Sequence, residues 1–114
     1  MKKKLLFLLL ILFWMACNPN SPRAVAEEFL ERVSNGEFRS ARSLGTESTI
    51  GFLNIAEALA KSTDSLPGEP VKYHIRRMEV GRDTAWCHYT WGEEEEVLRL
   101  VHVNGRWLVD IGKE

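Results

Sequence analysis

The pattern of apolar residues changes at residues 62–70, where a helical period gives way to alternation. Before this stretch, apolar side chains recur every three or four residues; after it, runs rich in Val, Thr, Tyr and Trp alternate with polar residues. The stretch itself contains Ser65, Pro67, Gly68 and Pro70, which predict a loop. A helical half followed by an extended half indicates an α+β domain.

Three helices are expected before the loop. The first begins at Ser21 and Pro22, because serine caps a helix N-terminus and proline fits its first turn. A short second helix is expected over residues 37–44, and a third over residues 48–61. Their apolar stripes predict the helical part of the core: Val25, Ala26, Phe29, Leu30 and Val33, then Phe38, Ala41 and Leu44, then Phe52, Ile55, Ala56 and Leu59.

Four antiparallel strands are expected after the loop, over residues 71–80, 84–91, 95–103 and 106–111. Asn104-Gly105 is typical of a two-residue hairpin turn and sets the register of the last two strands. That register places Arg99 opposite Asp110, as an exposed cross-strand ion pair, and His102 beside Trp107 on the core face. We therefore expect three N-terminal helices packed on a curved four-stranded antiparallel sheet.

The first 16 residues have the features of an export signal. Lys2 to Lys4 precede an apolar run from Leu5 to Ala16, and Cys17 follows it. The 12 residues of the run would span about 18 Å as a helix, which is too short for a hydrocarbon core of about 30 Å and fits a secretory signal.

A cysteine at the end of such a run resembles the lipid-acceptor residue of a bacterial lipoprotein, with residues 14–17 as the lipobox. Ala16 matches that pattern, whereas Trp14 and Met15 are bulkier than the usual residues. The resemblance implies a lipid on Cys17 and a location in the bacterial cell envelope, facing the periplasm. Residues 1–16 are then the signal, residues 17–21 the lipidated cysteine and a short tether, and residues 22–114 a single α+β domain.

The charge of the chain argues against nucleic acid as a partner. The signal holds three of the 15 Lys and Arg residues and none of the 16 Asp and Glu residues, so the rest carries 12 basic and 16 acidic side chains, a formal net charge of −4. Such a domain lacks the basic footprint of a nucleic-acid binder. Its expected contact with the membrane is the lipid on Cys17.

The domain also resembles small bacterial lipoproteins of unknown function that have a nuclear transport factor 2-like (NTF2-like), cystatin-like domain. The residues that carry the resemblance are Pro22, Val25, Ala26, Glu27, Phe29, Leu30, Gly36, Phe38 and Ala41, then Asp83-Thr84-Ala85, and finally Val103 to Asp110. They are structural positions. The wider superfamily contains isomerases, dehydratases, small-ligand binders and association domains, so the resemblance implies the fold and transfers no catalytic residue.

Metal and cofactor chemistry is not expected. His74, His88 and His102 lie on three different predicted strands, whereas a metal site needs several ligands that converge. Glu93 to Glu96 form a charged hairpin tip without the spacing of a calcium loop. Cys87 lies within an apolar strand pattern and is expected to be buried.

Trp86 and Trp91 are five residues apart in one predicted strand, so their side chains point to opposite faces. If the helices cover the face of Trp91, then Trp86 lies on the outer face beside His88, where it marks an interface or a ligand platform. The alternative is a bulge in the strand that buries both tryptophans.

The resulting hypothesis is a binding or association module for a protein partner, a second copy or a small ligand. Trp86, His88 and Arg76 are the candidate contacts on the sheet, and His102 and Trp107 are the candidate pocket residues. The alternative is a small enzyme, isomerase- or dehydratase-like, with His102 or Asp110 as its base. A third hypothesis is an accessory lipoprotein that holds a neighbouring protein at the membrane.

Overall fold

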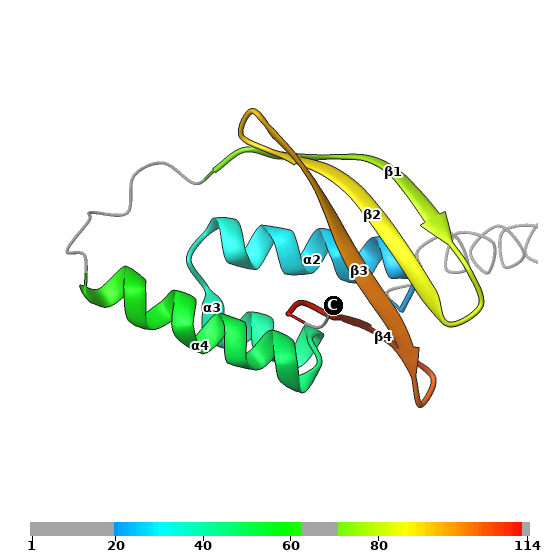
Figure 1. Cartoon of the computed structure of the whole chain (residues 1–114), viewed down its shortest axis with the longest axis horizontal. Helices are drawn as coiled ribbons and strands as arrows, with labels where there is room; N and C mark the ends of the chain where they lie inside the picture. The colour runs from blue at the N-terminus through cyan, green and yellow to red at the C-terminus, as the bar shows by residue number, and fades with distance from the viewer. Residues whose placement is uncertain (1–19, 63–70, 113–114) are drawn as a thin grey trace, which may run out of the picture.

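The structure is a computed structural model that describes residues 20–62 and 71–112. Its elements are α2 (Pro22–Ser34), α3 (Phe38–Ala41), the 3₁₀ turn η1 (Arg42–Leu44), α4 (Glu47–Ser62), β1 (Tyr73–Val80), β2 (Thr84–Trp91), β3 (Glu94–Val103) and β4 (Arg106–Val109). The strands form one antiparallel sheet in the order β1-β2-β3-β4, and β3 crosses in front of α2 in Figure 1. The expected α+β class and architecture are confirmed. The predicted signal and Cys17 lie outside the described residues.

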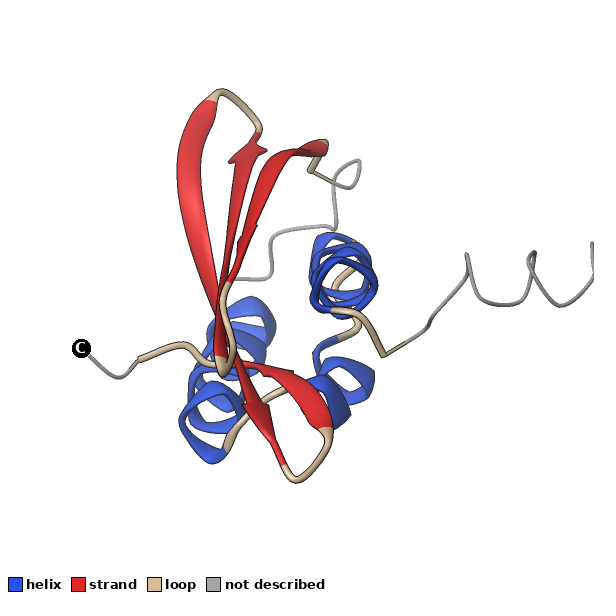
Figure 2. Ribbon diagram, turned by 90° about the vertical axis from the view of Figure 1, so that its right-hand side faces the viewer, coloured by secondary structure: helices blue, strands red, loops and turns tan. Residues whose placement is uncertain are grey.

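Helix α2 forms for the reasons seen in its sequence. The Ser21 hydroxyl accepts a hydrogen bond from the backbone N–H of Ala24 at 3.1 Å, and Pro22 occupies the first turn. Helix α2 lies along one face of the bent sheet (Figure 2), and its buried residues Val25, Ala26, Phe29 and Leu30 belong to the core. No helix in the described part of the chain is long and apolar enough to cross a membrane.

The β3–β4 hairpin has the predicted register. Asn104 and Gly105 have φ angles of 51° and 77°, as a tight hairpin turn with two left-handed residues requires. His102 pairs with Trp107. Next to the last strand pair, Leu100 and Val109, the backbone N–H of Asp110 donates to the carbonyl of Arg99 at a distance of 2.9 Å. Strand β4 ends at Val109, two residues earlier than expected.

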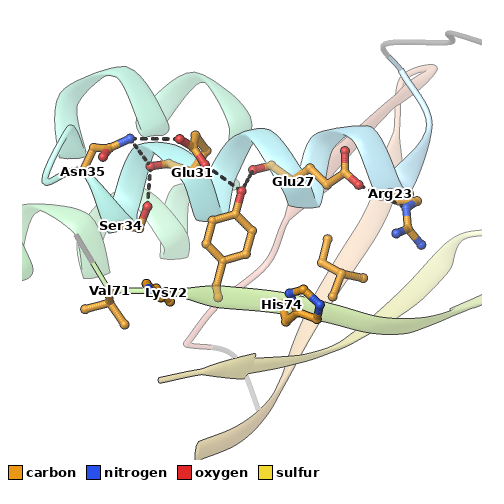
Figure 3. Close-up of a pocket in the computed structure, with 10 residues that line it drawn as sticks. Arg23, Glu27, Glu31, Ser34, Asn35, Val71, Lys72 and His74 are labelled. Atoms are coloured by element: carbon orange, nitrogen blue, oxygen red, sulfur yellow. Dashed lines mark hydrogen bonds and ion pairs between the residues drawn. The ribbon is translucent and has the colours of Figure 1, made fainter. Parts of the chain in front are cut away.

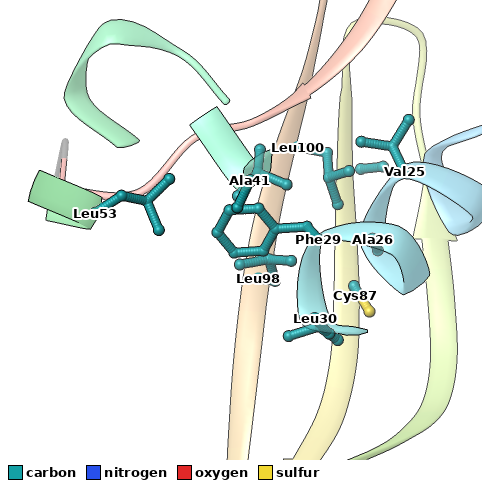
Figure 4. Close-up of a cluster of buried hydrophobic side chains, with 11 residues drawn as sticks. Val25, Ala26, Phe29, Leu30, Ala41, Leu53, Cys87, Leu98 and Leu100 are labelled. Carbon is teal, nitrogen blue, oxygen red and sulfur yellow. The ribbon is translucent and has the colours of Figure 1, made fainter. Parts of the chain in front are cut away.

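The core lies between α2 and the concave face of the sheet, and Figure 4 shows its side chains. Cys87 is buried there, as predicted. The core residues are Val25, Ala26, Phe29 and Leu30 from α2, Ala41 and Leu53 from the other helices, and Ala85, Cys87, Leu98, Leu100 and Val109 from the sheet.

The predicted inner face of the third helix is wrong. Three of the side chains that we expected in the core are largely exposed: Phe52 (47%), Ile55 (63%) and Leu59 (59%). Ala56 is half-buried, and the fully buried residues of α4 are Thr49 and Leu53.

Hydrogen bonds to Thr49 explain the rotation of α4. Its hydroxyl donates to the carbonyl of Val109 at 2.7 Å and accepts from the backbone N–H of Ile111 at 2.8 Å. These bonds fix a polar residue at the centre of the inner face, because the end of β4 has backbone groups that need partners there. A prediction from apolar spacing alone places such a residue outside.

Candidate functional site

The outer face of the sheet carries an exposed tryptophan. In β2, Ala85 and Cys87 are buried toward α2, so Trp86 and His88 point to the opposite face. Trp86 is 41% exposed, while Trp91 lies half-buried on the inner face, stacked with Tyr73 at a ring-centroid distance of 6.4 Å. The two tryptophans therefore occupy opposite faces, as the strand parity indicates.

Polar side chains border Trp86. Its strand neighbours are Glu79 in β1 and Arg99 in β3. Glu79 Oε1 lies 3.0 Å from the guanidinium of Arg77 and 3.4 Å from Nε2 of His88, the latter without hydrogen-bond geometry. An exposed aromatic ring within a polar border is typical of a protein contact surface.

A β-bulge in β1 changes the place of the candidate arginine. The register shifts between Ile75 and Arg77, so the bulge contains Arg76 and places Arg77 opposite His88. Sequence parity cannot locate such a bulge. It lies in β1, whereas the alternative left open by the sequence was a bulge in the strand of Trp86.

Asp110 joins the sheet to the start of α4. Its carboxylate accepts hydrogen bonds from the hydroxyls of Thr46 at 2.8 Å and Ser48 at 3.1 Å, and it pairs with the guanidinium of Arg99. The predicted Arg99–Asp110 pair is therefore present, but Asp110 is nearly buried, not exposed. Burial opposes ionisation, yet the hydrogen bonds from Thr46, Arg99 and Ser48 prevail and hold the pKa of Asp110 below its usual value.

The N-terminal end of α4 is joined to the outer face of the sheet through Asp110. Ser48 is four residues before Phe52, so it lies on the same side of the helix as the stripe. Its bond to Asp110 therefore places this side of α4 next to Arg99. On the other side of the helix, Glu57 pairs with arginines of α3 and η1.

We name the combined region the association surface. Phe52, Ile55 and Leu59 of α4 were not predicted to belong to a surface site. Their spacing is that of a helical stripe, but the prediction placed that stripe in the core. The association surface consists of Trp86, His88 and Val97 of the sheet and Phe52, Ile55 and Leu59 of α4.

His102 and Trp107 do not line a described pocket. Their rings stack with centroids 4.9 Å apart at the end of the β3–β4 hairpin, and His102 is exposed. The two residues are neighbours as predicted. At this end of the hairpin, however, the face of the sheet that carries the core is open to solvent. Asp110 lies on the outer face and is held by three partners, so the structure does not bring the two candidate bases into one site.

An open groove of about 980 Å³ separates α2 from β1. Figure 3 shows its charged wall, with Glu27 and Glu31 of α2 above His74 of β1. The Tyr73 hydroxyl crosses the groove and donates to Glu31 Oε2 at 2.8 Å. Burial and the nearby Glu31 carboxylate raise the pKa of Tyr73 to about 12, so this phenol stays protonated and serves as a donor.

Two further properties limit the chemistry of the described residues. Burial raises the pKa of Cys87 to about 11, so its thiol has little thiolate character at neutral pH. Within residues 20–62 and 71–112, no group of three or more His, Cys, Asp or Glu side chains is placed to hold a metal ion.

Helices packed on a bent four-stranded antiparallel meander define an α+β domain, and the comparison with solved structures supports an NTF2-like fold. Among solved structures, the chain is similar to the crystal structure of a "Putative NTF2-like transpeptidase" from Campylobacter jejuni, with 17% identity and a TM-score of 0.56. The match covers 81% of this chain and 99% of that chain, which supports the shared fold. No protein-family profile and no curated protein matches the sequence.

Proposed function

We propose that this protein is an envelope lipoprotein, anchored by a lipid on Cys17 and facing the periplasm, that binds a protein partner through the association surface. The observation that carries the proposal is the exposure of Trp86 on the sheet and of the apolar stripe Phe52, Ile55 and Leu59 on α4. Single exposed apolar side chains are ordinary, but several large ones on one sheet face and one helix stripe favour an interface. Tryptophan is also enriched among the residues that dominate binding energy.

The geometry supports a protein partner more than a small ligand. The association surface extends over a sheet face and a helix. Trp86 also lines an open hollow of about 440 Å³ with Glu79 and residues 80–84, but this hollow includes no residue of α4. Small-ligand sites are usually concave and mostly apolar. The groove between α2 and β1 is open and has charged walls with Glu27, Glu31, Arg23 and Lys72.

Site-specific photocrosslinking in the native host tests the proposal. A photoreactive phenylalanine analogue replaces Trp86 or Leu59 on the association surface, or Glu28 on α2 as the matched control. We expect one discrete protein adduct from both surface positions and none from the control. An adduct of twice the chain mass would identify the partner as a second copy. No adduct at the surface positions, or equal adducts at all three, would contradict the proposal.

The second candidate is an enzyme, and one observation favours it: the similar structure is named as a transpeptidase. An identity of 17% supports the fold and does not carry an activity to this chain. His102 is the sequence candidate for a base and is accessible. Turnover of a peptide donor with an amine acceptor by the purified mature chain, lost in His102→Ala with folding intact, would favour this alternative over the association module.

A further inference from the structure

The N-terminal end of the described chain contacts a particular hairpin. The side-chain amide of Asn20 donates to the carbonyl of Gly105, in the β3–β4 turn, at 2.8 Å. Asn20 is three residues after Cys17, and three extended residues reach at most about 11 Å. A lipid on Cys17 would therefore hold this turn close to the membrane.

A second turn lies at the same end of the sheet. The β1–β2 connection at residues 81–83 adjoins the β3–β4 turn, because the backbone N–H of His102 donates to the carbonyl of Asp83 at 2.8 Å. We call the two turns with their flanking residues the anchor end: Val80, Arg82, Asp83, Val103, Asn104, Gly105 and Arg106.

The two ends of the sheet differ in chemistry. At the anchor end, Arg82 and Arg106 are exposed, and the apolar Val80 and Val103 are 59% and 43% exposed. The two arginines and the one carboxylate, Asp83, give the anchor end a formal net charge of +1. The opposite turn has four exposed carboxylates in Glu93 to Glu96, and the length of β3 places it about 30 Å away.

We propose that the anchor end lies on the surface of an anionic bilayer, with Arg82 and Arg106 at lipid phosphates. The inference rests on the lipid anchor of the proposed function. Arginine pairs well with phosphate and can place its apolar stem against an interface, where the two valines also lose contact with water. The negative surface potential of an anionic membrane attracts the arginines and repels the glutamate turn. The strands therefore stand away from the membrane, and the association surface faces sideways.

Spin labels on the lipidated full-length product test this orientation. Val103→Cys carries the label at the anchor end, Glu95→Cys carries it at the far turn, and the protein with only the buried Cys87 is the blank. The protein is reconstituted in phosphatidylcholine vesicles with or without phosphatidylglycerol. We expect a higher ratio of oxygen to nickel-complex accessibility at 103 than at 95, and a larger difference when phosphatidylglycerol is present.

Charge reversal separates the orientation from the anchor. In R82E/R106E the label at 103 should become as water-accessible as the label at 95, although the protein still floats with the vesicles. The matched variant K72E/R76E, with two reversals away from the anchor end, should retain the difference. Equal water accessibility at 103 and 95 in the floating unreversed protein, or no effect of R82E/R106E, would overturn the orientation. A protein that does not float would overturn the anchor itself and the orientation with it.

Discussion

Replacing Asp110 with asparagine should destabilise the domain by about 1.5–3 kcal/mol at neutral pH. The carboxylate is nearly buried and has three side-chain partners, Thr46, Ser48 and Arg99. The amide oxygen can still accept from a hydroxyl, but the charge opposite Arg99 is lost, and a hydrogen bond to a charged group contributes about 1.5–3 kcal/mol. Urea unfolding monitored by tryptophan fluorescence measures the difference in the free energy of unfolding.

The effect of Asp110→Asn should depend on pH with a defined sign. The folded-state pKa of Asp110 lies below its usual value, so its stabilising contribution is complete above the pKa of the unfolded chain, about 3.9. It is lost as the pH falls through the folded-state pKa, and the difference between the two proteins should shrink there. Asp83→Asn, in an exposed turn, is the control and should change stability by less than about 0.5 kcal/mol. Equal destabilisation by the two substitutions, or a difference that grows on acidification, would refute the reasoning.

Three further predictions concern the rotation of α4, the Tyr73–Glu31 hydrogen bond and the proposed lipid anchor. Leu53→Ala should cost about 2–5 kcal/mol in the free energy of unfolding and Phe52→Ala about 1 kcal/mol or less, because only Leu53 is fully buried; the reverse order in urea unfolding would place α4 in the predicted rotation. Tyr73→Phe removes the hydrogen bond to Glu31 and should lower the free energy of unfolding by about 0.5–1.5 kcal/mol at pH 7. If the bond needs the carboxylate, the same substitution made in a Glu31→Gln background should cause no such loss. Cys17→Ser should abolish the acyl mass in the native host and release the protein from the detergent phase; a retained acyl mass would contradict lipidation.

The strand half of the fold was more predictable than the helical half. A period of two leaves two choices for each strand, and the turn at Asn104-Gly105 selects one of them for the last hairpin. For Trp86, parity predicted only a face opposite to that of Trp91, and a bulge that buries both remained an alternative. The bulge at Arg76 does not follow, because one inserted residue leaves no clear compositional mark.

Helix α4 shows why the candidate site was only partly predictable. Its sequence offers two adjacent inner faces, one through Phe52 and one through Leu53. Apolar content favours the first, but the hydrogen bonds of Thr49 to the end of β4 favour the second. Those partners are about 60 residues away in sequence, so no local pattern reveals them.

Thr49 also prevents the chain from hiding its exposed stripe. Turning α4 by one residue, about 100°, would bring Phe52 inward but would break the hydrogen bonds that join the Thr49 hydroxyl to Val109 and Ile111. The position is tightly confined, since a Cβ on Gly45 would lie 2.5 Å from the Thr49 methyl group. The apolar stripe therefore stays exposed in this packing, and the proposed partner would not have to reorganise the helix before binding.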